Sequence, residues 1–415
     1  MNNSAASQYD LVIIGGGMEG ASLACALGGQ ALRIAIVEAV PYQSASQPSY
    51  DDRAIALSFG TQRIFQSIGV WQELAVHATP IKHIHVSEQG AFGATRLHHG
   101  EENVAALGYV ATARDIGQTL IHKLKTLDNV DLISPAQFTD VQINDTSATV
   151  MIEKDTQALN IECRLLVAAD GGQSTSRQLL GVAATKTDYQ QSAIIANVSS
   201  QQPHNNIAYE RFTPNGPLAI LPMSDDQVSR NRSSIVWTLP SSMVEAVLQF
   251  DDQEFLDQLQ HNFGNRLGKF QKVGKRSVYP LYLMQAQEQV RPRVVLIGNA
   301  AHTLHPIAGQ GFNLGLRDVA ALAEIVVNAQ RINSDIGDLE VLQHYAQWRE
   351  TDHKHIIGLT DSLVRLFSNH FPLLRTARTA GLLALDTLPA AKHLLAKHTM
   401  GLAGKLPKLA RGLAL

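Results

Sequence analysis

A Gly-rich stretch near the start of the chain, residues 9–38, constrains the fold more than any other. An apolar run long enough for a buried strand leads into Gly15, Gly17 and Gly20, which are spaced G-x-G-x-x-G. A run that suits a helix follows, and a second apolar run ends at Glu38. This order of strand, tight turn, helix, strand and acid is typical of a dinucleotide-binding βαβ unit.

Each part of this unit has a mechanical reason. Gly15 permits the turn, Gly17 lets the backbone approach a pyrophosphate, and Gly20 lets the helix pack closely on the strand. The helix N-terminus offers N–H groups and a partial positive charge to phosphates, and Glu38 can accept hydrogen bonds from ribose hydroxyls. The alternative is a Gly-rich turn in another kind of α/β protein. The motif alone leaves open whether the dinucleotide is FAD or NAD.

A second strand–turn–helix pattern, in residues 294–318, favours FAD. An apolar run ends at Gly298, a loop with Pro306 leads to Gly309 and Gly311, and a long helical pattern follows. The halves of an NAD-dehydrogenase site lie close together in sequence, whereas a distant second segment is typical of flavoprotein oxidoreductases of the glutathione-reductase type. We therefore predict an α/β fold with a Rossmann-like FAD-binding domain of that type.

Three motifs together resemble the FAD-dependent aromatic hydroxylases. The first is the Gly-rich turn with Glu38, the second is the Asp170-Gly171 pair, and the third is the segment 298–313. They occur in this order, and the resemblance covers roughly residues 8–365. Within the family, four stretches are similar to the 2-polyprenyl-6-methoxyphenol hydroxylases of ubiquinone biosynthesis: DDRAIALS, ERFTPNGPLAILPMSD, GKRSVYPL and HPIAGQGFNLGLRD.

One position departs from the wider family. The third motif usually begins with Gly-Asp, whose acid hydrogen-bonds the ribityl chain of FAD, and here it begins Gly298-Asn299. Asn can still accept and donate hydrogen bonds but carries no charge, so we expect FAD binding to survive. Asn at this place also resembles the 6-methoxyphenol hydroxylase subgroup more than its ring-hydroxylating relatives.

The resemblance also implies which residues contact FAD. Beyond the first turn and Glu38, the matching positions are Arg53, Arg114, Gln118, Asp170, Gly171, Gly298, Asn299, Pro306, Gly309, Gln310, Gly311 and Asn313. The alternative for Arg53 is a surface ion pair with Asp51 or Asp52. For Arg114 and Gln118 the alternative is the solvated face of an amphipathic helix.

The chain is expected to divide into interleaved domains. The FAD-binding domain takes residues 8–80, 100–182 and 285–360, and the remaining parts are an inserted antiparallel-sheet domain, 81–99 and 183–284, and a C-terminal helical tail, 361–415. Short strand candidates separated by Gly, Pro, Asn and Asp recur through the inserted part. By resemblance, this sheet forms the floor of an aromatic substrate pocket.

Composition excludes several classes of protein. The chain has 415 residues, of which 45% are hydrophobic and 17% charged, and a net charge of −3, so its overall electrostatics give no reason to expect nucleic-acid binding. Its two cysteines form no C-x-x-C pair and no disulfide framework. No apolar run is long enough for a transmembrane helix, and the polar N-terminus lacks the charged region of a signal peptide. We expect a cytoplasmic protein.

Two other kinds of site were weighed. His302 and His305 form an H-x-x-H pattern, but no convincing third ligand lies nearby in sequence and the stretch already reads as a flavin loop, so no metal is predicted. A Ser-His-Asp triad is unsupported because the G-x-S-x-G pattern is missing. The catalytic residue, including the base that deprotonates the phenol, stays unidentified at this stage.

The tail from Phe371 carries seven Lys and Arg residues against one acid, with Leu and Ala between them. Such basic amphipathic helices bind anionic membrane surfaces or partner proteins. We expect peripheral contact with the inner membrane on its cytoplasmic face, and list a quinone-biosynthesis complex and a homo-oligomer as further partners. The alternative is a helix packed on the core with a solvated basic face.

The resemblance implies the reaction. NAD(P)H reduces FAD, O2 adds to the reduced flavin as a C4a-hydroperoxide, and its terminal oxygen passes to a polyprenylated methoxyphenol ring. Because the chain has a single G-x-G-x-x-G, we expect no dedicated nicotinamide-binding domain, and NADH or NADPH should bind transiently. One rival is an FAD enzyme that acts on another ring position, on another aromatic substrate or in another reaction type. The other is a non-catalytic flavin-binding subunit.

Overall fold

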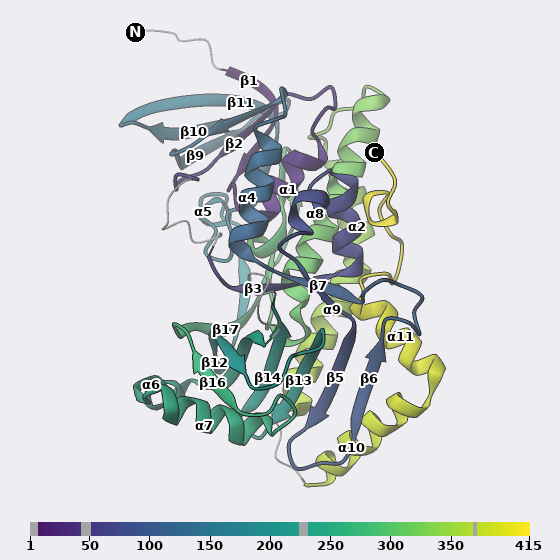
Figure 1. Cartoon of the computed structure of the whole chain (residues 1–415). Coiled ribbons are helices and arrows are strands. Elements are labelled where there is room, and N and C mark those ends of the chain that lie inside the picture. Colours follow the sequence, from purple (N-terminus) through teal and green to yellow (C-terminus); the bar gives the residue numbers. More distant parts are fainter. Residues whose placement is uncertain (1–6, 43–50, 224–230, 368–371) are drawn as a thin grey trace.

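The computed structural model describes residues 7–42, 51–223, 231–367 and 372–415. Of residue 7 and residues 372–377 it describes the backbone alone. Two large sheets follow one another along the molecule, a small sheet lies between them, and the C-terminal helices run beside the second large sheet (Figure 1).

The first sheet is built around parallel strands. The order along it is β18-β19-β11-β1-β2-β8, and the pairs from β19 to β8 are all parallel. The strands are β1 (Ser7–Ile14), β2 (Ile34–Val37), β8 (Val130–Ile133), β11 (Gln157–Ala168), β18 (Val290–Arg291) and β19 (Val294–Leu296). The buried strands predicted before the Gly-rich turn and before Gly298 are confirmed as β1 and β19.

Both faces of this sheet are covered, which explains why its strands are continuously apolar. Leu11 and Ile13 of β1 pack under α1 (Met18–Ala26), α4 (Ala113–Leu124) and α8 (Gln310–Arg331). The alternate residues Val12 and Ile14 pack against the antiparallel strands β9 (Gln137–Ile143) and β10 (Ala148–Lys154) on the other face. This arrangement leaves the carboxyl ends of the parallel strands as the open edge.

The second sheet is almost entirely antiparallel. Its order is β20-β17-β12-β15-β14-β13-β5-β6, with β16 beside β12, and only β13 and β5 run parallel. The strands are β5 (His83–Glu88), β6 (Ala94–His98), β12 (Ala184–Ser200), β13 (Ile207–Thr213), β14 (Gly216–Pro222), β15 (Arg232–Pro240), β16 (Phe270–Val273), β17 (Ser277–Ala286) and β20 (His302–Thr303). Segments far apart in sequence therefore share one sheet.

Helices cover one face of the second sheet and leave the other toward the first. The covering helices are α6 (Ser241–Gln249) and α7 (Asp252–Phe263), whose Phe255 and Phe263 pack with Trp237. A capping box at Asp251 and Glu254 starts α7.

The opposite face of the second sheet meets the small sheet, whose strands are β3 (Ala54–Ser58), β4 (Thr79–Ile81) and β7 (Gly108–Thr112). Short helices follow at α2 (Phe59–Ser67), α3 (Trp71–Leu74) and α5 (Thr175–Leu179).

The C-terminal segment packs on the rest of the chain, as in the alternative that the sequence left open. It contains α9 (Leu339–Phe367), α10 (Pro372–Thr387) and α11 (Pro389–Thr399). Arg378 Nη2 of α10 lies 2.6 Å from Glu88 Oε1 of β5, and both residues are buried. Beyond α11 the chain returns to the helices beside the first sheet, where the Gly60 N–H of α2 donates to the Met400 carbonyl. None of the described helices is both long and apolar enough to cross a membrane.

Candidate active site

The Gly-rich turn closes at the carboxyl end of β1, and its geometry requires glycine. Gly15 has φ +98°, and a Cβ there would lie 2.6 Å from the Ala169 carbonyl oxygen, at the end of the neighbouring strand β11. A Cβ on Gly20 would overlap the Gly15 carbonyl oxygen. Helix α1 begins after Gly17 with no side-chain cap, so its first N–H groups remain available to a phosphate.

Glu38 lies at the end of β2, where the sequence placed it, and its carboxylate spans the turn. Oε2 accepts from the Gly16 N–H at 2.7 Å, and Oε1 accepts from the Val40 N–H at 2.9 Å. Beside it is the Tyr42 hydroxyl, which is buried and has no hydrogen-bond partner among the described residues. Burial and the nearby Glu38 raise the pKa of Tyr42. Sequence reasoning did not single out Tyr42, because it follows the motif in a loop.

The Asp170-Gly171 turn meets the third motif through one arginine. Asp170 accepts from the Ser174 hydroxyl at 2.5 Å and from the Ser176 N–H at 2.8 Å, so its carboxylate organises the start of α5. Arg177 donates to the Gly172 carbonyl and to the Ala300 carbonyl, both at 3.0 Å. The second and third motifs, more than a hundred residues apart, are therefore fixed to each other at the same edge of the first sheet.

The Gly298-Asn299 turn lies against the first motif. Gly298 has φ +57°, and a Cβ there would lie 2.8 Å from Glu19 Cγ of α1. The Asn299 side chain is exposed, consistent with an amide that reaches a bound cofactor. Glu19 also contacts Gly315 of α8, and burial raises the pKa of its carboxyl. Sequence reasoning missed Glu19, although an acid inside the G-x-G-x-x-G was a visible signal.

The loop before α8 is strained and ends in another uncapped helix. Ala308 and Gly309 both adopt left-handed backbone angles, with φ +58° and +60°, and α8 follows with no side-chain cap. Gly311 has open space around it, and Gln310 Oε1 is buried without a partner among the described residues. A strained loop with unsatisfied groups at a helix N-terminus is typical of a ligand site. Pro306 immediately precedes this loop.

Asn313 has a structural task in this arrangement. Its Oδ1 accepts from the Ser58 N–H at 2.8 Å and from the Thr61 hydroxyl at 2.7 Å. Its Nδ2 donates to the carbonyls of Ala56 and Gly309 at 2.9 and 2.7 Å. Because the amide makes four hydrogen bonds within the protein, it holds the start of α8 against β3, and its contact with a cofactor stays a prediction.

The three remaining predicted residues are either paired with other side chains or exposed. Arg53 Nε lies 2.7 Å from Asp51 Oδ1, the ion pair given above as its alternative, and its guanidinium lies over the Tyr279 ring. Arg114 pairs with Asp52 and is exposed, and Gln118 is exposed on α4. A cofactor contact of these three residues stays a prediction.

The two histidines of the H-x-x-H pattern, which the sequence gave no reason to pair as metal ligands, face different groups. The His302 and His353 Nε2 atoms each lie 2.7 Å from a different oxygen of Asp318, which is fully buried. Burial alone would raise the pKa of Asp318, but His353 and Arg349 hold it well below its usual range. His305 instead packs edge-on against Tyr189.

The cluster of His302, Asp318 and His353 is the one group of metal-ligand type among the described residues. Its distances are those of hydrogen bonds, and Arg349 Nε lies 2.6 Å from the same carboxylate. A positive guanidinium at this place disfavours a cation beside it, so the cluster is better described as a buried ion network that ties α8, α9 and the third motif together. The absence of a metal stays a prediction.

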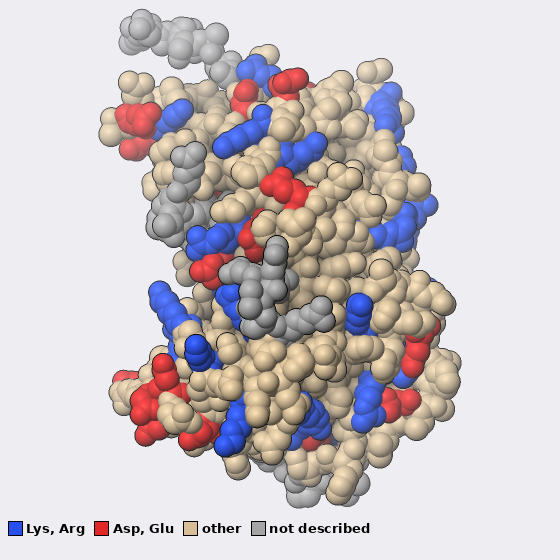
Figure 2. Space-filling view, viewed as in Figure 1, with Lys and Arg blue, Asp and Glu red and all other residues tan. Residues whose placement is uncertain are grey.

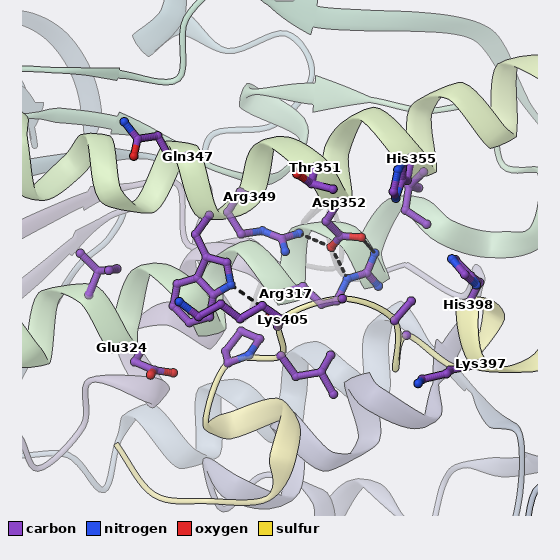
Figure 3. Close-up of a pocket in the computed structure, with 18 of the residues that line it drawn as sticks. Arg317, Glu324, Gln347, Arg349, Thr351, Asp352, His355, Lys397, His398 and Lys405 are labelled. Carbon is purple, nitrogen blue, oxygen red and sulfur yellow. Dashed lines mark hydrogen bonds and ion pairs between the residues drawn. The ribbon is translucent and has the colours of Figure 1, made fainter. Parts of the chain in front are cut away.

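A cavity of about 890 Å³ lies elsewhere, between α8, α9 and the C-terminal segment (Figure 3). Asp352 is held there by Arg317 Nε at 2.7 Å and Arg349 Nη2 at 2.6 Å. None of the residues of the three motif turns (15–20, 170–171 and 298–311) lines this cavity. The cavity is therefore not assigned to the cofactor, although it is large. Its ion pairs fix the side of α9 that faces the C-terminal segment.

The groups around the turns fit a dinucleotide better than any other ligand class. Two helix N-termini without side-chain caps, α1 and α8, open at the carboxyl edge of one parallel sheet. The Glu38 carboxylate and the unpartnered Tyr42 hydroxyl stand beside the first, and Gln310 Oε1 stands beside the second. These residues would hold the two ends of FAD, with pyrophosphate at α1 and the flavin near α8.

We expect Gly15→Val to abolish FAD binding, chiefly because the new side chain strikes the Ala169 carbonyl and strains a left-handed turn, on the order of 1–3 kcal/mol for the strain alone. The measurement is the flavin-to-protein ratio of the purified variant. Gly100→Val is the matched control, because a Cβ at Gly100 meets nothing within 4 Å. A Gly15→Val protein with a full complement of flavin would contradict the role of this turn.

Acidification should destabilise the protein through His305. Burial lowers the pKa of His305 from 6.5 to about 4, so the unfolded chain binds a proton that the folded chain refuses. Its contribution to stability is therefore complete above pH 6.5 and is lost as pH falls toward 4. Between pH 7 and pH 5 the loss should be about 2 kcal/mol in the free energy of unfolding, measured by urea titration.

His305→Asn should remove that part of the pH dependence, because Asn can still accept the Ile307 N–H that His305 Nδ1 accepts at 3.1 Å. His344→Asn, at an exposed position of α9, is the control and should keep the wild-type slope. Equal slopes for wild type and His305→Asn would show that His305 is not buried as a neutral group.

Comparison with known proteins agrees with this geometry. The family model described as an FAD binding domain matches residues 8–351. The ubiquinone hydroxylase UbiL of Rhodospirillum rubrum is 36% identical over 421 residues, covering 100% of this chain and 95% of that protein. The 3-demethoxyubiquinol 3-hydroxylase of Escherichia coli is 29% identical, covering 95% and 98%.

Among solved structures, p-nitrophenol 4-monooxygenase PnpA from Pseudomonas putida superposes with a TM-score of 0.79 at 17% identity, covering 96% of this chain and 99% of that one. That likeness shows the fold, which is the predicted α/β FAD-binding architecture. The family model spans most of the chain, and the turns that carry its motifs meet at one sheet edge. The chain therefore belongs to the FAD-binding-domain family and shares a full-length relationship with the ubiquinone hydroxylase of Rhodospirillum rubrum.

Proposed function

We propose that this protein is an FAD-dependent monooxygenase that hydroxylates the ring of a polyprenylated methoxyphenol in ubiquinone biosynthesis. The observation that carries the proposal is the meeting of three distant motifs at one sheet edge, directly over a second sheet with an apolar face. Full-length similarity to proteins named as ubiquinone hydroxylases supports the pathway. The 6-methoxyphenol branch is favoured by the four stretches and by Asn299.

FAD, when bound, accepts a hydride from NADH or NADPH and activates O2. The protein's own residues would bind and orient the cofactor. The first-turn amides of α1 would hold the pyrophosphate and Glu38 would hold the ribose. The amides at the start of α8 would donate to the flavin as negative charge develops on it, and preorganised donors of this kind are worth about a few kcal/mol. The strained loop at Ala308 would lie beside the cofactor and shield it from water.

We assign the two halves of the chain different tasks. Residues 8–80, 100–182 and 285–360 would bind FAD, and residues 81–99 and 183–284 would hold the substrate ring and its prenyl chain. Positively and negatively charged residues are scattered over the surface drawn in Figure 2, and no continuous basic tract appears among the described residues on that face. That distribution agrees with a small-molecule substrate and disfavours a nucleic acid.

The decisive experiment is mass spectrometry of lipid extracts from cells that lack this protein. We expect ubiquinone to be lost and 2-polyprenyl-6-methoxyphenol to accumulate, because the ring can no longer be hydroxylated. The intact gene should restore ubiquinone and the Gly15→Val gene should not. Accumulation of a different ring intermediate would move the reaction to another position, and a normal ubiquinone level would contradict the pathway. NAD(P)H oxidation by the purified protein separates an enzyme from a non-catalytic flavin-binding subunit.

We also propose peripheral membrane contact through the C-terminal helices. Leu383, Leu388 and Leu394 are about half exposed there, at 46%, 55% and 57%, and the exposed Lys397 follows on α11. Exposed leucines beside basic residues are typical of helices that lie on anionic lipid. The contact would give the enzyme access to a substrate whose prenyl chain stays in the bilayer.

Leu388→Ser with Leu394→Ser should reduce co-flotation with phosphatidylglycerol vesicles severalfold, since each substitution removes buried apolar area at the lipid surface. Point substitutions are preferable to truncation, because the tail packs on the second sheet and returns to the first domain. Val76→Ser with Ile332→Ser is the matched control, at two exposed apolar positions outside the tail. Undiminished flotation of the Leu variant would contradict the membrane role.

A further inference from the structure

The deprotonation step needs a base, and β13 carries a candidate that the sequence did not mark. Successive residues of a strand point to opposite faces of the sheet. Tyr209 and Arg211 point toward the helices, because Tyr209 packs edge-on against Phe263 and Arg211 donates to the Asn262 carbonyl. Glu210 therefore points to the other face, toward the first domain.

The neighbours of Glu210 on that face are parts of the cofactor site. Two residues along the strand, Phe212 packs in one cluster with Ile307 of the loop before α8. Two residues in the other direction, Ala208 packs with Val110 and Ile81 of the small sheet. The carboxyl of Glu210 thus lies between the loop that covers the flavin and the small sheet, over the open face of the second sheet.

The residues beside Glu210 across the sheet are apolar. In register, Ile195 pairs with Val236, Val236 with Ala219, Ala219 with Glu210, and Glu210 with Val86. All five side chains are half-buried, as expected for the floor of a cavity. Four of them can contact a prenyl chain and an aromatic ring, and Glu210 is the one polar group in the row.

The surroundings of Glu210 leave its carboxyl without a partner. No ion pair or hydrogen bond of this carboxyl occurs among the described residues, and no charged group contributes to its ionisation. The acid nearest along the facing strand, Glu88, is paired with Arg378, and on α9 Asp361 is paired with Arg365. Burial alone raises the pKa of Glu210 to about 7. At that value the carboxyl can both accept and return a proton near neutral pH.

We propose that Glu210 is the catalytic base that removes the proton from the phenol hydroxyl of the substrate, an inference that rests on the proposed function. The O–H bond of the phenol breaks, the proton binds a carboxylate oxygen of Glu210, and the ring becomes a phenolate. A ring carbon of the phenolate bonds to one oxygen atom of the O2 that the bound cofactor would activate, and the O–O bond breaks. When the ring regains aromaticity, that carbon loses its hydrogen as a proton, which leaves with the second oxygen atom as water. The proton held by Glu210 returns to the phenolate oxygen, so Glu210 ends as it began.

Glu210→Gln tests this assignment, because it keeps the shape of the side chain and removes its ability to take a proton. The probe is 2-methoxy-6-prenylphenol, added to the holoenzyme with NADH or NADPH and O2, and the readout is the pH profile of the hydroxylation rate. In the wild type we expect the rate to rise with pH through about 7, because the Glu210 carboxylate then accepts the phenol proton as the ring reacts. In Glu210→Gln the phenol should bind, but the rate should show no rise over that range.

Hydroxylation by Glu210→Gln should fall on the order of 100-fold at neutral pH, as is typical when a general base is removed, and recover at alkaline pH. Glu210→Asp should restore part of the rate, and the FAD content should not change in either variant. Glu153→Gln, an exposed acid on β10, is the matched control and should behave as wild type.

Two outcomes separate this inference from the function on which it rests. If wild type binds and hydroxylates the phenol, and Glu210→Gln shows the same rate and the same pH profile, Glu210 is not the base and the hydroxylase function stands. If wild type neither binds nor hydroxylates any prenylated phenol, the proposed function fails and the role of Glu210 fails with it.

Discussion

The close approach of three backbone turns is the constraint on which the rest of the structure depends. Gly15 brings the end of β1 so near the Ala169 carbonyl that no side chain fits between them. Arg177 then joins the second turn to the third by donating to the Gly172 and Ala300 carbonyls. Since each turn lies at the carboxyl end of a parallel strand, the three together define one ligand edge, as the rule for open α/β sheets requires.

The third turn also fixes the position of the second sheet relative to the first. Immediately after it, His302 and Thr303 form β20 and pair with β17. The third turn is therefore linked both by the chain and by hydrogen bonds to the second sheet. His302 also reaches Asp318, which is shared with His353 and Arg349. A buried carboxylate is costly unless several partners satisfy it, and here the three partners come from two elements, β20 and α9. The network therefore fixes how α8 and α9 lie against the site.

The sequence predicted the local units well and their contacts less well. Spacing and periodicity sufficed for the Gly-rich turn, Glu38 and the two buried strands, because those patterns report backbone geometry within a few residues. Pairing across long separations was beyond such patterns. The two histidines of the H-x-x-H pattern lie in different environments. The Asn313 side chain hydrogen-bonds the end of β3, and Arg53 is paired with Asp51. The distance between side chains depends on the assembled fold, which spacing alone does not report.

The position of Glu210 is another feature that sequence patterns alone do not report. Glu210 begins the stretch ERFTPNGPLAILPMSD, which carried the family resemblance, yet nothing in that stretch reveals which face of the sheet it occupies. Only the register places Val86 and Ala219 beside it. An apolar floor favours a prenyl chain through the hydrophobic effect and, by the same lack of water, penalises a charged carboxylate. One physical feature, the apolar face, would thus both retain the substrate and tune the base that we propose for its activation.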